Sequence, residues 1–155
     1  LIESMKNLSD EYLLLIAGEV YGDFKKYDEL IDRLGLLDRI NLQVRYIPEN
    51  EIPVFFSAAD VCVLPYRTAT QSGIVGIAYH FELPVIVTNV GGLGEMVEEN
   101  KTGLIINELS PERISDSLKG YFENNLKGKF IPYIYEYKKE HSWQKLALNI
   151  TNNYL

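Results

Sequence analysis

The 155-residue sequence has a single cysteine, Cys62, which excludes an internal disulfide and any zinc site built from several cysteines. It is poor in basic residues: 15 Lys and Arg stand against 22 Asp and Glu, and the net charge of −7 argues against duplex nucleic acid as a partner. No apolar run approaches the roughly 20 residues that cross a bilayer. What remains is an ordinary globular composition, 46% apolar and 24% charged, which suffices for one buried core.

Several enzyme motifs are also missing. The sequence has no Gly-x-Gly-x-x-Gly after a strand, which disfavours a nicotinamide cofactor, and it has neither a P-loop nor a Gly-x-Ser-x-Gly elbow. His80 and His141 lie far apart in the sequence and no Cys cluster accompanies them. We therefore expect no metal site and no cofactor.

The chain alternates short apolar runs with longer stretches of helical periodicity. The apolar runs predict strands at residues 12–18, 40–46, 60–65, 84–88 and 103–107. Helices are predicted at residues 24–34, 49–59, 72–81, 95–99, 110–124, 129–139 and 142–154, and residues 1–8 resemble the tail of a helix. Such alternation with short connections predicts an α/β fold with a three-layer, Rossmann-like, doubly wound parallel sheet. The run at residues 12–18 is apolar on both faces, as in a strand covered by helices on both sides.

Open parallel sheets bind ligands beyond the carboxyl ends of their strands, and the loop after residues 60–65 is the strongest candidate. It leads into a helix that begins near Ser72 and Gly73, where free amides and the helix dipole attract anions. Arg67 is the only Lys or Arg between residues 46 and 100, and it is well placed to neutralise a phosphate. The ordinary alternative is an N-cap serine beside a solvated arginine.

Two further loops lie at the same expected edge. Gly91 and Gly92, followed by Glu95, allow a close backbone approach to a ligand with a carboxylate behind it. The alternative is a tight turn before a helix with an acidic first turn. The loop that opens with Gly18 and Glu19 follows the first predicted strand.

Four sequence segments follow one another along the chain: Ala59 to Arg67, Ala69 to Gly73, Pro84 to Glu95, and Thr102 to Ile105. Together they resemble the C-terminal, donor-binding lobe of GT-B glycosyltransferases of the large retaining group (group 1, family 4 type). The likeness runs from about Leu14 to the end of the chain. It implies transfer of a glycosyl group from a nucleotide-diphosphate sugar to an acceptor, in the synthesis of a cell-surface polysaccharide or glycolipid.

The resemblance also implies roles for particular residues. The nucleotide sugar is a substrate, and no metal is expected, because helix amides and basic side chains stabilise the departing diphosphate. Arg67, Ser72 and Gly73 would stabilise that diphosphate. The implied donor-binding residues are Gly18, Glu19, Tyr46, Gln71, Ser72, Gly73, Ile74, Gly91, Gly92 and Glu95.

The sequence departs from the resemblance in two ways. Many members carry Glu-x7-Glu around the helix at residues 72–81, but those places fall on Ala69 and Ile77, and residues 52–81 contain no Glu. The family's first strand of this lobe, its basic loop and the acceptor-binding N-terminal lobe would all precede Leu1. We therefore expect residues 1–155 to form one nucleotide-sugar-binding domain, a fragment that partners with the N-terminal lobe of the same polypeptide and is inactive alone.

Two other functions stay open: a non-catalytic nucleotide-binding α/β module, which the missing acidic pair favours, and a GT-B nucleotide-sugar epimerase. We expect a cytoplasmic location, because a lone free thiol favours a reducing compartment. Residues 127–145 hold five lysines among aromatic residues. Such a segment suits peripheral contact with the inner face of the membrane, a partner domain, or helices docked on the sheet.

Overall fold

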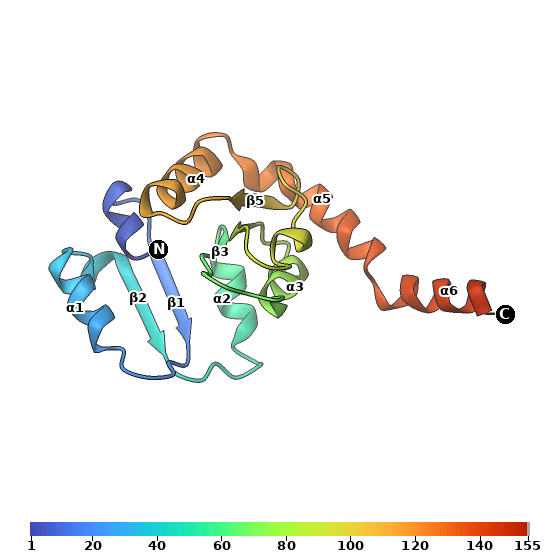
Figure 1. Ribbon diagram of the computed structural model, residues 1–155, viewed down its shortest axis with the longest axis horizontal. Helices are drawn as coiled ribbons and strands as arrows, with labels where there is room; N and C mark the ends of the chain where they lie inside the picture. Colours follow the sequence, from blue (N-terminus) through green and yellow to red (C-terminus); the bar gives the residue numbers. More distant parts are fainter. Residues whose placement is uncertain (155) are drawn as a thin grey trace.

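The computed structural model describes residues 1–154, without the side chains of residues 143, 146, 149 and 152–154. Strands and helices alternate as expected (Figure 1). In chain order the elements are η1 Glu3–Asn7, β1 Leu14–Gly18, α1 Lys25–Arg33, η2 Leu37–Arg39, β2 Ile40–Val44, α2 Ile52–Ala58, β3 Cys62–Leu64, α3 Gly73–His80, β4 Val85–Thr88, η3 Gly94–Met96, β5 Gly103–Ile106, α4 Pro111–Glu123, α5 Leu126–Glu140 and α6 Trp143–Tyr154.

All strand pairs of the described chain are parallel, which confirms the α/β class. β1 pairs with β2, with Leu14 opposite Ile40, and β4 lies between β3 and β5 in a second sheet. The prediction of a single doubly wound sheet needs one adjustment, because no ladder joins the two sheets in the part of the chain that the structure describes.

Two predicted helices are only short 3-10 turns. The predicted helix at residues 95–99 is η3, and the helical tail expected at residues 1–8 is η1. Neither segment has the length over which an α-helix stabilises itself, so each takes the tighter form that is common in connectors.

The centre of the core is β4, whose four residues are all buried. Helices on both sides cover it with apolar side chains. From α3 these are Val75, Ala78 and Tyr79, from α4 Ile114, Leu118 and Tyr121, and from α5 Phe130 and Ile134. The sheet β3–β4–β5 is therefore packed on both faces, as the near-continuous apolar strands predict.

The C-terminal helices lie partly outside this core. Lys127 at the start of α5 pairs with Asp60 at 2.9 Å, and Lys138 donates to the carbonyl of His80 at 3.0 Å. α6 extends away from the rest of the molecule (Figure 1). None of the helices that the structure describes has both the length and the apolar character needed to cross a bilayer.

Candidate functional site

The start of α3 is the best-defined element of the predicted site. Ser72 is the N-cap, in extended conformation, and its Oγ accepts from the Ile74 N–H at 3.3 Å. Its carbonyl accepts from Val75 N at 3.2 Å, and its side chain is buried, with the Tyr66 hydroxyl 3.4 Å from Oγ. Gly73 is exposed, and no atom lies within 4 Å of the place where its Cβ would be.

These contacts decide which groups of the turn face solvent. The Ile74 amide already donates to the Ser72 hydroxyl. Ser72 is therefore an N-cap serine, as the ordinary alternative in the sequence analysis expects. Gln71 and Gly73 remain open to solvent. An anion approaching α3 would therefore meet the Gly73 amide and the positive end of the helix dipole first.

The glycines after β4 are required by a contact between two loops. Gly92 N donates to the Thr70 carbonyl at 3.1 Å. Gly91 has a positive φ of 52°, and a Cβ there would lie 1.7 Å from the carbonyl oxygen of Ala69. The space over these glycines is thus filled by the backbone of the loop before α3, which supports the tight-turn interpretation.

Three polar residues at strand ends, which the sequence analysis did not select, hold the same region together. Thr88 donates from Oγ1 to the Tyr66 carbonyl at 2.6 Å, which anchors the beginning of the loop after β3. Asn89 donates from Nδ2 to Asn107 Oδ1 at 2.8 Å, which joins the ends of β4 and β5. Thr88 is the last residue of β4, and Asn89 and Asn107 directly follow β4 and β5, so their place at the carboxyl ends of the strands is the signal that could have identified them.

Arg67 is exposed, and none of the ion pairs among the described residues includes it. Its guanidinium lies close enough to the α-amino group of Leu1 to affect the pKa of that group. Burial lowers the pKa of the Leu1 α-amino group, Glu3 opposes that shift, and the Arg67 guanidinium lowers the pKa further. The loop after β3 thus carries a cation that is free to pair with an anion.

The structure does not join every predicted residue to this site. Gly18 is half-buried and Glu19 exposed after β1, and Tyr46 is 64% exposed after β2. Among the described residues, no hydrogen bond or ion pair links these positions to the loop before α3. Glu95, on η3, is exposed beyond the glycine turn.

The structure also shows the two positions, Ala69 and Ile77, at which many family members carry the Glu-x7-Glu pair. Ala69 is half-buried, and its carbonyl lies over Gly91, whereas Ile77 is half-buried on α3. Neither position offers a carboxylate to a ligand hydroxyl. Within the described residues, moreover, no three His, Cys, Asp or Glu side chains come together as a metal site.

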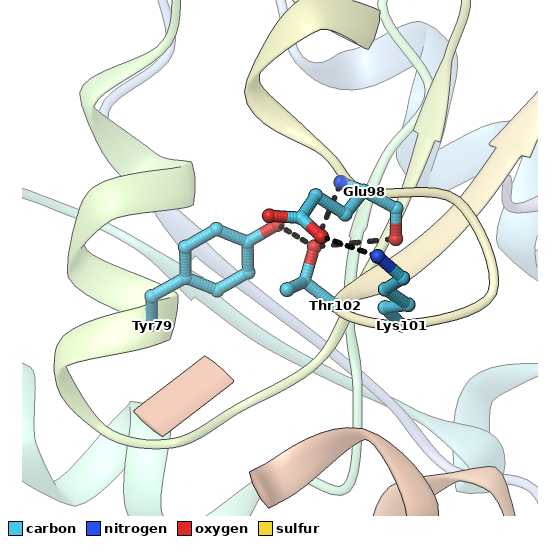
Figure 2. Close-up of polar contacts among 4 residues, drawn as sticks. All are labelled: Tyr79, Glu98, Lys101 and Thr102. Atoms are coloured by element: carbon cyan, nitrogen blue, oxygen red, sulfur yellow. Dashed lines mark hydrogen bonds and ion pairs between the residues drawn. The ribbon is translucent and has the colours of Figure 1, made fainter. Parts of the chain in front are cut away.

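A buried polar cluster fixes the turn that leads into β5 (Figure 2). Tyr79 of α3 donates to Thr102 Oγ1 at 2.7 Å, and Thr102 Oγ1 accepts from Glu98 N at 2.9 Å. Lys101 pairs with the Glu98 carboxylate at 3.1 Å on the exposed side. Burial raises the pKa of Tyr79, and the Thr102 hydrogen bond opposes that shift. We interpret the cluster as structural, because it ties α3 to β5 behind the predicted site.

Comparison with known proteins gives this geometry a family context. The sequence profile described as "Glycosyl transferases group 1" matches residues 1–141. A D-inositol 3-phosphate glycosyltransferase of Corynebacterium urealyticum is 29% identical over 136 residues, which cover 84% of this chain and 31% of that protein. The chain spans less than half the length of the first curated relatives it matches.

Solved structures share the fold. Anabaena HepE in complex with UDP superposes with a TM-score of 0.80 at 18% identity, covering 98% of this chain and 44% of that one. The separately crystallised C-terminal domain of a group 1 glycosyl transferase from Francisella tularensis gives a TM-score of 0.76 at 22% identity. That match covers 90% of this chain and 76% of the other domain. The GT-B, Rossmann-like fold expected from the sequence is confirmed.

Proposed function

Because this chain belongs to the group 1 glycosyl transferases, we propose that it supplies the donor-binding lobe of an enzyme that transfers a glycosyl group from a nucleotide-diphosphate sugar to an acceptor. The acceptor would be a growing cell-surface polysaccharide or a glycolipid. The second lobe of the same polypeptide would supply the acceptor site, since the relatives are more than twice as long as the matched region.

One observation carries the proposal: the open start of α3 beside a free arginine. No atom lies within 4 Å of the place where a Gly73 Cβ would be, and the exposed Arg67 stands on the loop that leads to it. The hydrogen bond from Gly92 to Thr70 fixes the shape of that loop. N–H groups at a helix start and an exposed cation together suit a diphosphate.

In the proposed reaction the bond between the anomeric carbon and the diphosphate oxygen breaks, and negative charge develops on the leaving diphosphate. The Gly73 amide, the dipole of α3 and the Arg67 guanidinium would stabilise that charge. The acceptor oxygen forms the new glycosidic bond and releases its proton. Gln71 and Glu95, both exposed near the turn, would contact the sugar or nucleotide.

The test is calorimetric titration of the 155-residue chain with UDP, UDP-sugars and GDP-sugars, for the wild type and for Ser72→Asp. Aspartate is a good N-cap, so α3 is kept while a negative charge is placed at the phosphate position. A charge-assisted hydrogen bond contributes about 1.5–3 kcal/mol, so the variant should bind roughly 10- to 100-fold more weakly.

Ser142→Asp is the matched control. Ser142 Oγ accepts from Lys145 N at 3.2 Å, so it caps α6 in the same way, and α6 extends away from the part of the molecule that holds α3 (Figure 1). This variant should bind as the wild type does. Equal affinities for wild type and Ser72→Asp, with both folded by circular dichroism, would contradict the proposed site.

We further propose that the 155-residue chain alone transfers no sugar and that the complete enzyme retains the anomeric configuration. Sugar release by the isolated chain above the uncatalysed rate would overturn the first statement. Proton NMR of the product formed by the full-length enzyme tests the second, because the anomeric coupling distinguishes the two configurations.

A non-catalytic nucleotide-binding module is the second candidate. It is favoured by the absence of a carboxylate at Ala69 and Ile77. It predicts specific nucleotide binding by the full-length protein without consumption of any nucleotide sugar. Turnover of a nucleotide sugar by the full-length protein would exclude it.

We also propose that the protein acts in the cytoplasm, on the inner face of the membrane. The free thiol of Cys62 is weak support for a reducing compartment. Burial raises its pKa to about 11, and a thiol that stays protonated reacts slowly in any compartment. Cell fractionation followed by a salt wash tests the location: a peripheral protein leaves the membrane fraction in high salt.

A further inference from the structure

Tyr66 follows β3 closely and is not among the donor-binding residues that the sequence analysis expects. Its backbone is fixed, because the buried Thr88 donates from Oγ1 to the Tyr66 carbonyl at 2.6 Å. Its ring is half-buried and packs against the core. The fixed backbone and the packed ring together hold the Tyr66 hydroxyl beside Ser72, at the start of α3.

The hydroxyls of Tyr66 and Ser72 form a pair. Tyr66 Oη lies 3.4 Å from Ser72 Oγ, and Ser72, which is 7% exposed, also accepts from Ile74 N. Each hydroxyl has one hydrogen to donate, and only one of the two hydrogens can lie between the two oxygens. Among the described residues, neither hydroxyl has a further acceptor within hydrogen-bonding distance. The pair therefore keeps one O–H group for water or a ligand.

The neighbours of this pair favour an anion as the ligand. Arg67 directly follows Tyr66 and is exposed, and Gly73 directly follows Ser72 and is also exposed. The positive end of the α3 dipole lies at the same place. A hydrogen bond to an ionised acceptor is about twice as strong as one between neutral groups. The remaining O–H group thus suits a phosphate oxygen better than a sugar hydroxyl.

The chemistry of the two hydroxyls indicates which of them donates to the ligand. A phenol is a stronger acid than an aliphatic alcohol, and it is therefore the stronger hydrogen-bond donor. When Ser72 donates to Tyr66 Oη, it polarises the Tyr66 O–H, and hydrogen bonds in such a chain strengthen one another. Tyr66 is also the more exposed residue of the two.

We propose that Tyr66 binds the diphosphate of the nucleotide sugar directly, through a hydrogen bond from its hydroxyl to a diphosphate oxygen. Ser72 orients that hydroxyl by donating to Tyr66 Oη. The inference rests on the proposed function, and it adds a donor on a packed side chain to the Gly73 amide and the Arg67 guanidinium. This hydrogen bond would strengthen as negative charge develops on the leaving diphosphate.

Tyr66→Phe tests the proposal, because it keeps the packed ring and removes only the hydroxyl. We expect the variant of the 155-residue chain to bind UDP or GDP about tenfold more weakly than the wild type in calorimetric titration. Its affinity for uridine or guanosine, which carry no phosphate, should not change when measured by ligand-detected NMR.

The outcomes separate this inference from the proposed function. Equal affinity of the wild type and Tyr66→Phe for the nucleoside diphosphate would overturn the inference alone, and so would an equal loss of affinity for the nucleoside. A wild type that binds neither UDP nor GDP would overturn the proposed function as well.

Tyr121→Phe controls for the loss of a tyrosine hydroxyl elsewhere. The Tyr121 hydroxyl donates to the Asp60 carbonyl at 2.8 Å, before β3 begins and hence at the opposite end of that strand from Tyr66. We expect this variant to have a lower Tm and to bind UDP or GDP as the wild type does. Equal weakening of binding in Tyr121→Phe and Tyr66→Phe would attribute the loss to general destabilisation and would overturn the inference.

The role of Ser72 is tested by Ser72→Ala, introduced into the wild type and into Tyr66→Phe. If Ser72 orients the Tyr66 hydroxyl, its removal should weaken UDP or GDP binding several-fold in the wild type and much less in Tyr66→Phe, because coupled residues are not additive. A loss by the same factor in both backgrounds would contradict the hydroxyl pair.

Discussion

The half of the chain built on β3, β4 and β5 and the half built on β1 and β2 have similar strand sequences but different surroundings. β4 is buried at every position, and the backbone hydrogen bond from Gly92 N to the Thr70 carbonyl joins the loops that follow β3 and β4. β1 is equally apolar, but its residues alternate between half-buried and exposed, and none of them is buried. An apolar strand sequence therefore indicates that the strand is suited to burial on both faces. How far it is buried depends on which strands and helices pack against it.

The largest expected difference between the halves is in core stability. Ile86→Ala in β4 removes a side chain that is 0% exposed and leaves a cavity, so it should lower the free energy of unfolding by about 2–5 kcal/mol. Leu15→Ala in β1 should cost less than about 1 kcal/mol, because that side chain is already partly in water. Urea unfolding followed by circular dichroism measures both, and equal losses would contradict the contrast.

The contact between the two loops should be the next most sensitive feature. Gly91→Ala places a Cβ against the Ala69 carbonyl at a positive φ, so we expect a loss of about 2 kcal/mol or more in stability. The control is Gly76→Ala, in α3 with open space at its Cβ, which should stabilise the chain by about 0.5–1 kcal/mol. The Tm measured by thermal unfolding should therefore fall for Gly91→Ala and rise for Gly76→Ala.

The smallest expected effect concerns the buried tyrosine behind the site. Tyr79→Phe removes the hydrogen bond to Thr102 and should cost about 1–3 kcal/mol at neutral pH. Because burial raises the pKa of Tyr79 above its unfolded value near 10, its contribution is complete below pH 10 and is lost as the pH rises beyond it. Stability should thus fall less steeply above pH 10 in Tyr79→Phe, and parallel pH profiles would contradict this.

Much of the molecule could be predicted from local patterns. The five strands and the main helices lie where apolar periodicity indicates, and Ser72 caps α3 as its position after a strand predicts. Gly73 is exposed, and no atom lies within 4 Å of the place where its Cβ would be. Local patterns did not single out Thr88, Asn89 and Asn107, because a polar residue at the end of a strand does not show which distant loop or strand it will bind.

The sequence by itself determined the order of strands and helices, the capped start of α3 and the place of Arg67 beside it, because these depend on residues close together along the chain. Only the tertiary structure decided that β4 lies between β3 and β5, that the glycines at 91 and 92 serve the neighbouring loop, and that the Ser72 hydroxyl is paired with its own helix. These outcomes depend on which distant backbone lies alongside, and a local sequence pattern does not contain that information.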